Sequence, residues 1–202
     1  MSLTRLQFSK LLLFVVCLAP AGLLGWNFYH DQLGANPFEA LTRDSGEWTL
    51  RFLLLTLLMT PLRGILHRPW PLHLRRMLGL YSFFYACLHL LTYLWFDQFF
   101  DWQEIVNDII KRPFITAGIT AWILLLPLAV TSTNGMMRRL GRRWKRLHRS
   151  IYLIAILGVL HFFWLVKADL REPLIYAGLL VILLGYRIAK WSQKREFGIA
   201  AR

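Results

Sequence analysis

Six apolar runs separated by charged connections are the feature that most limits what this chain of 202 residues can fold into. Each run is long enough for a helix to cross a hydrocarbon core of ~30 Å at a rise of ~1.5 Å per residue. The runs do not alternate apolar and polar residues, as the strands of a transmembrane β-barrel would. We therefore predict an all-α, polytopic membrane protein in which residues 1–202 form one six-helix bundle, with helices over 11–29, 48–66, 77–96, 114–130, 151–166 and 174–188.

The formal charge of +13 follows the order of these runs. Eighteen of the 24 Lys and Arg residues fall in the N-terminal tail, in the connections after the second and fourth runs, and near the C-terminus, whereas the other three connections hold five. Because an excess of basic residues marks the cytoplasmic side, we expect an inner-membrane protein with both termini in the cytoplasm. A basic chain can also bind nucleic acid, but no soluble stretch here is long enough to fold by itself.

Residues 97–113, between the third and fourth runs, mix acidic with apolar residues. This mixture predicts a short amphipathic helix on the outer membrane surface. It is either an interfacial cap or an edge on which a partner outside the membrane docks.

Two of the six histidines, His89 and His161, lie in the middle of apolar spans, where an ionisable side chain is costly and usually has a partner. Both lie ~15–18 Å along parallel helices from the basic ends, so the two can meet at one level. Facing imidazoles from two helices can ligate a planar macrocycle from both sides, and we therefore expect this pair to hold haem iron. Small residues near the two histidines favour the same interpretation, although they also allow simple helix packing: Gly79, Ser82, Ala86 and Gly158.

A third histidine, His148, precedes the fifth run, and by itself would be a surface residue. An ideal helix turns it about 140° away from His161, so a second haem stacked beneath the first does not follow from the spacing. The third helix has Arg75 and Arg76 where an inner partner would be needed, and His73 would have to reach from a loop. The spacing supports one defined site and a partial inner one.

Arg51 lies inside the second run, about one turn from its expected outer end. Such a residue either extends its guanidinium to the interface or pairs with a buried carboxylate. Since His89 also lies in the outer half of its span, we expect Arg51 to be a candidate partner for a haem propionate.

In the order and spacing of its motifs the chain resembles the ferric-reductase-like transmembrane family, and within it the haem-binding membrane subunits of bacterial periplasmic protein-methionine-sulfoxide reductase systems. The resemblance covers about residues 11–188. It is carried by Arg75-Arg76-Met77-Leu78-Gly79-Leu80 leading to Leu88-His89-Leu90, then Thr131-Ser132-Thr133, Leu140-Gly141, Trp144, Leu147-His148, Tyr152 and His161.

The resemblance implies a subunit that takes electrons from the quinone pool, passes them through haem b, and delivers them to a soluble molybdenum-containing partner that repairs oxidised methionines of periplasmic proteins. Methionine sulfoxide reduction itself is then expected on that partner. His89, His148 and His161 match the family's haem-associated histidines. FMN is also implied as a cofactor, with a cytosolic flavin reductase as an alternative donor, although the chain shows no flavin-binding motif.

Two other functions fit intramembrane histidines. In a proton-coupled secondary transporter His89 and His161 would be protonation or substrate sites, but the chain lacks the inverted repeat typical of that class. In an anchoring subunit without a cofactor they would only form hydrogen bonds between helices. The absorption spectrum of the purified protein separates these functions from haem binding.

Overall fold

The computed structural model describes residues 3–200, with the side chains of residues 7, 8 and 11–193, so residues 1–2 and 201–202 of the predicted bundle lie outside it. No strand occurs among the described residues, which confirms the all-α prediction. The α-helices are α1 (Leu3–Tyr29), α2 (Pro37–Leu66), α3 (Trp70–Thr92), α4 (Trp102–Lys111), α5 (Pro113–Val130), α6 (Asn134–Leu140), α7 (Arg142–Leu147), α8 (Ile151–Leu165) and α9 (Arg171–Ala200), with a π-turn η1 (Tyr93–Asp97) and a 3-10 turn η2 (His148–Ser150).

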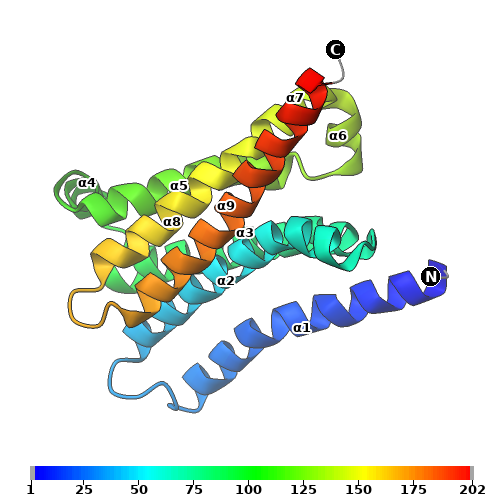
Figure 1. Ribbon diagram of the computed structural model, residues 1–202. Coiled ribbons are helices and arrows are strands. Elements are labelled where there is room, and N and C mark those ends of the chain that lie inside the picture. Colours follow the sequence, from blue (N-terminus) through cyan, green and yellow to red (C-terminus); the bar gives the residue numbers. More distant parts are fainter. Residues whose placement is uncertain (1–2, 201–202) are drawn as a thin grey trace.

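Within residues 3–200, six helical segments are long and apolar enough to cross a membrane, as the sequence predicted. They are Leu11–Tyr29, Pro37–Leu66, Trp70–Asp97, Pro113–Val130, Arg142–Leu165 and Arg171–Gln193. Figure 1 shows α1 and α9 directing the two chain ends to the same end of the bundle as α6 and α7. We name this the terminal end, and we name the opposite end, which carries α4 and the connections 30–36 and 166–170, the loop end. The cytoplasmic location of the terminal end stays a prediction.

The second span is longer than hydropathy predicted, because α2 begins at Pro37 and not near residue 48. The Asn36 side chain accepts a hydrogen bond from the Glu39 backbone N–H, and Pro37 takes the first helical position, where a missing N–H is tolerated. Polar residues in the first three turns, among them Thr42, Arg43 and Glu47, hid this start from an apolar window. The added turns supply one wall of the site described below.

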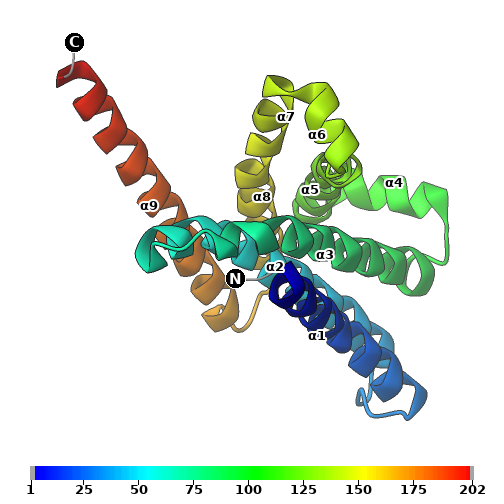
Figure 2. The same ribbon diagram turned by 90° about the vertical axis from the view of Figure 1, so that its right-hand side faces the viewer.

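The connection between the third and fourth spans contains the predicted amphipathic helix, α4. The Asp101 side chain caps it by accepting hydrogen bonds from the Gln103 and Glu104 backbone N–H groups. Figure 2 shows α4 running sideways from the end of α5, across the direction of the spans. Its Ile105 and Asp108 are buried against the bundle, whereas Trp102, Val106 and Ile110 are exposed on another face: an arrangement suited to a helix lying in a membrane interface.

Helix α1 is attached to α3 through two tyrosine hydroxyl groups. Tyr81 donates to the Phe14 carbonyl at 2.7 Å, and Tyr85 donates to the Cys17 carbonyl at 2.8 Å. The Tyr85 hydroxyl also accepts from the Ala21 N–H at 3.0 Å, so it stands between a carbonyl and an amide that would pair in a regular α-helix. This insertion lies beside Pro20, the proline inside α1.

Helix α9 compensates for a hydrogen bond that α2 lacks near the terminal end. Pro61 has no N–H, so the Leu57 carbonyl four residues earlier lacks its usual helical donor. The Arg187 Nη2 donates to that carbonyl at 2.9 Å, and the Arg187 guanidinium lies over the Tyr152 ring, 5.0 Å from its centroid. A cationic side chain thus satisfies a backbone group that lipid could not.

Candidate cofactor site

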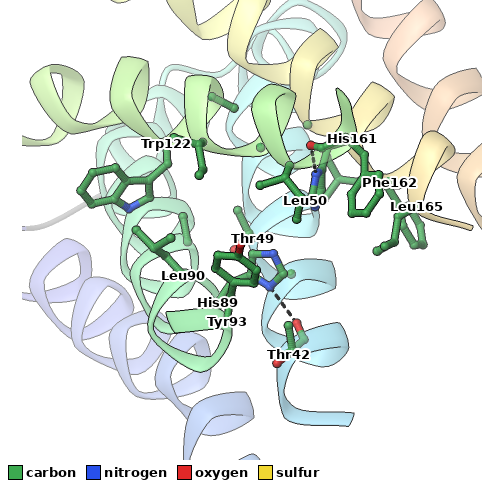
Figure 3. Close-up of a pocket in the computed structure, with 18 of the residues that line it drawn as sticks. Thr42, Thr49, Leu50, His89, Leu90, Tyr93, Trp122, His161, Phe162 and Leu165 are labelled. Atoms are coloured by element: carbon green, nitrogen blue, oxygen red, sulfur yellow. Dashed lines mark hydrogen bonds between the residues drawn. The ribbon is translucent and has the colours of Figure 1, made fainter. Parts of the chain in front are cut away.

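His89 of α3 and His161 of α8 face each other within the bundle, near the loop end. Their ring centroids are 5.9 Å apart and their planes meet at 79°. Figure 3 shows the two rings entering one pocket from different walls. The prediction that these residues meet at one level is confirmed.

Each ring is held by a backbone carbonyl at its Nδ1. His89 Nδ1 lies 2.8 Å from the Thr42 carbonyl of α2, and His161 Nδ1 lies 2.6 Å from the Phe114 carbonyl of α5. A carbonyl can only accept, so Nδ1 carries the hydrogen in both rings and Nε2 of the neutral imidazole keeps its lone pair. Metal-binding histidines in proteins are commonly oriented in this way.

A glycine lies against each imidazole. A Cβ added to Gly46 of α2 would stand 3.0 Å from Nδ1 and Cε1 of His89. One added to Gly118 of α5 would stand 2.8 Å from Nδ1 of His161. The two rings therefore pack against bare backbone, which no other residue type would provide.

The rings line a cavity of about 640 Å³ enclosed by α2, α3, α5 and α8. Its walls are mostly apolar, with Leu50, Leu53, Trp122, Ile154 and Phe162 among them. Polar residues gather at the side nearest the loop end, which we call the mouth: Arg43, Glu47, Asp97, Gln98 and Arg112. The volume and the apolar lining with a few polar groups are typical of a site for a small molecule or cofactor.

Ion pairs hold the two arginines of the mouth. Arg43 Nε lies 3.2 Å from Glu47, and Arg112 Nε lies 3.2 Å from Asp108 of α4. Asp108 also accepts from the Tyr93 hydroxyl and from Gln98 Nε2, at 3.2 and 2.9 Å. Both guanidinium groups retain further N–H donors for a ligand at this position.

Comparison with known proteins decides the family. Residues 45–159 match the family described as "Ferric reductase like transmembrane component". The chain is 52% identical to the "Protein-methionine-sulfoxide reductase heme-binding subunit MsrQ" of Herminiimonas arsenicoxydans, over 95% of this chain and 89% of that protein. It is 53% identical to the protein of the same name from Rhodospirillum rubrum, over 97% and 95%. The chain belongs to the MsrQ family. No solved structure matched it.

Family membership confirms the resemblance inferred from the sequence. The ferric reductase segment contains Gly46, His89 and Gly118, and it ends two residues before His161. The MsrQ relatives match nearly the whole length of the chain. In the MsrQ family the site is therefore to be sought within these helices.

His148, the third histidine expected in an MsrQ protein, lies apart from this cavity. It begins η2 at the terminal end, where its ring stacks on Trp144 with centroids 3.8 Å apart. Its Nδ1 lies 3.2 Å from the Trp144 carbonyl, while its Nε2 is buried without a hydrogen bond. The angle of about 140° between His148 and His161 holds only for an ideal α-helix. It does not apply here, because the 3-10 turn that begins at His148 rotates ~120° per residue. His73, the other inner candidate, is an exposed residue of α3.

Arg51 does not line the cavity. Because α2 begins at Pro37, Arg51 lies fourteen residues inside the helix and not one turn from its end. Its guanidinium pairs with Glu47, donates to the Tyr176 hydroxyl at 3.1 Å and lies over Trp48. In this MsrQ-family chain Arg51 is linked to the mouth of the cavity through its ion pair with Glu47.

Sequence reasoning missed the two mouth arginines and the parts of α2 and α5 that hold the histidine rings. Arg43 and Arg112 were counted only as connection charges, because the hydropathy runs placed them outside the spans. The carbonyls of Thr42 and Phe114 carry no side-chain signal. The two glycines, in contrast, do carry a signal in the sequence. Gly46 precedes His89, and Gly118 precedes His161, by the same number of residues, 43.

Proposed function

We propose that the chain binds haem b between His89 and His161 and carries electrons to a periplasmic, molybdenum-containing methionine sulfoxide reductase that repairs oxidised proteins. The observation that carries this proposal is the pair of Nε2 atoms on one apolar cavity, each ring fixed by a backbone carbonyl at Nδ1. The MsrQ relatives are named as haem-binding subunits of such a system, which supports the choice of cofactor and partner.

The residues present fit a haem. Two imidazoles that both offered Nε2 to one iron through bonds of ~2 Å would have their ring centroids about 6 Å apart. The observed separation is 5.9 Å. Among the described residues no group of three or more His, Cys, Asp or Glu side chains is placed to hold a bare metal ion. A macrocycle supplies the four ligands that two histidines leave open.

Haem supplies reversible one-electron transfer when bound. The protein would orient the two imidazoles and keep water out of the apolar cavity. At the mouth it would neutralise the propionate carboxylates of the haem. We assign the last role to Arg43 and Arg112, which line the mouth, in place of Arg51. Guanidinium groups suit this role because they remain charged and donate two parallel hydrogen bonds to a carboxylate.

The proposed direction of transfer runs from the terminal end to the loop end. The basic residues concentrated toward the terminal end favour a cytoplasmic location in a bacterial inner membrane. The cavity lies near the loop end, where a soluble partner outside the membrane would dock. The donor in this proposal is the quinone pool, with a cytosolic flavin reductase as the alternative, and FMN as a second cofactor.

An absorption spectrum of the detergent-purified protein, oxidised and then reduced with dithionite, tests the proposal. Sharp reduced bands of bis-histidine haem b are expected, and flavin fluorescence of the denatured extract tests for FMN. A colourless preparation from haem-replete cells would overturn haem binding and favour the transporter or anchoring functions. Quinol-driven reduction of methionine sulfoxide by the co-purified soluble partner tests donor and acceptor together.

A further inference from the structure

The two site histidines are held by the same arrangement, repeated on two pairs of helices. In α2, the Thr42 carbonyl contacts His89 Nδ1 and Gly46 lies beneath the ring. In α5, the Phe114 carbonyl contacts His161 Nδ1 and Gly118 lies beneath the ring. The carbonyl precedes the glycine by four residues in both helices, and the histidine follows the carbonyl by 47 in both.

The spacing of four residues explains why the second position is glycine. In an α-helix the carbonyl of residue i accepts from the N–H of residue i+4, so the glycine is the helical donor to the very carbonyl that the imidazole uses. The carbonyl has two lone pairs, and the ring reaches the second one from the side that a Cβ at i+4 would cover. Removing that Cβ opens the carbonyl to the ring.

Most other glycines of the spans have more room; the exception is Gly64 of α2, where a Cβ would meet the Tyr186 hydroxyl and not an imidazole. A Cβ on Gly22, Gly25, Gly178 or Gly185 would meet nothing within 4 Å. One on Gly158 would only reach ordinary contact with Leu50, at 3.6 Å. Among the described glycines, a Cβ would press on an imidazole only at Gly46 and Gly118.

We propose that Gly46 and Gly118 are positioning residues that seat the two imidazoles, so that each Nδ1 reaches its carbonyl and each Nε2 faces the cavity. This inference rests on the proposed haem function and names residues that determine the ligand geometry of the same site. A methyl group at either position displaces the ring toward the cavity or breaks its Nδ1 hydrogen bond. Loss of that bond makes the imidazole a weaker donor to iron.

The test compares Gly46→Ala and Gly118→Ala with Gly25→Ala and Gly178→Ala in the full-length protein. Haem per protein, the low-spin electron paramagnetic resonance g-values and the midpoint potential are measured after purification. We expect haem affinity to fall about tenfold in the site variants, the lower value seen when an outer partner of a metal ligand is lost. The potential should rise, because a weaker imidazole donor stabilises ferric iron less. The change should be larger for Gly118→Ala, where the contact is closer.

The two control variants should match the wild type in all three measurements. Alanine is a better helix former than glycine, so a general loss of helix stability is not the expected result of either site change. Circular dichroism and elution volume check folding, and if Gly118→Ala does not accumulate, Gly46→Ala, with its looser contact, keeps the comparison decisive.

Wild-type haem content, g-values and potential in both site variants would overturn the positioning role while leaving haem binding intact. A colourless wild-type protein would instead overturn the proposed function itself. The two failures are therefore distinguishable in one set of preparations.

Discussion

The two ends of the bundle treat a histidine differently. At the loop end, His89 and His161 turn Nε2 toward a cavity of about 640 Å³. At the terminal end, His148 has the same kind of Nδ1 contact with a carbonyl, but its Nε2 is buried against protein and its ring is covered by Trp144. A fixed tautomer is thus common to all three residues, and what distinguishes the loop-end pair is open space in front of the lone pair.

A ligand site thus needs both an oriented donor and room for the ligand. The Trp144 indole is itself held, since its Nε1 donates to the Thr131 carbonyl at 2.9 Å. An iron at His148 Nε2 therefore requires a rearrangement of the terminal end, whereas the loop-end pair is already arranged.

Removing a loop-end histidine should have the largest effect. In His89→Ala or His161→Ala one axial ligand is lost, and we expect the reduced bis-histidine bands to disappear from the purified protein. His148→Ala should keep the bands of the loop-end haem. If His148→Ala abolished those bands and His161→Ala did not, the contrast between the two ends would be reversed.

Arg187→Leu should destabilise the terminal end without changing the loop-end spectrum. The Leu57 carbonyl would lose its donor, and a buried polar group left without a partner costs about 1–3 kcal/mol. Thermal unfolding followed by circular dichroism measures the loss. The cost should shrink in a Pro61→Ala background, where a helical N–H returns to that carbonyl, and an equal cost in both backgrounds would contradict this account.

Arg43→Gln should weaken haem retention about fivefold, the effect of an exposed ion pair worth ~1 kcal/mol. The midpoint potential should fall, because a positive charge near the haem favours its reduced form. Haem titration and spectropotentiometry measure the two effects. Arg51→Gln is the matched control on the same helix, and an effect of Arg51 larger than that of Arg43 would restore the sequence-based assignment.

Trp144→Phe should have the smallest effect. It keeps an aromatic ring beside His148 but removes the hydrogen bond to Thr131, a loss of about 1 kcal/mol in the free energy of unfolding. Modification of His148 by diethylpyrocarbonate, followed by mass spectrometry, should become faster. Unchanged reactivity at His148 would show that Trp144 does not close this end.

The sequence predicted the spans because run length and helix rise are local properties, and it predicted the loop-end pair because depth along parallel helices follows from counting residues. It failed where structure depends on groups without a side-chain signal. Polar residues in the first turns of α2 hid the start of this helix from a hydropathy window, and this misplaced Arg51 as well. The contacts of His148 depend on a 3-10 turn that a uniform helical angle does not represent.

The paired arrangement of the site also has a consequence for how the protein is made. His89 and its seat belong to α2 and α3, and His161 and its seat belong to α5 and α8, so each half of the site is complete within its own pair of helices. Membrane helices insert first and associate afterwards. During synthesis the first half can therefore form before the second has left the ribosome, and the cavity is created only when the two preformed halves dock in the bilayer.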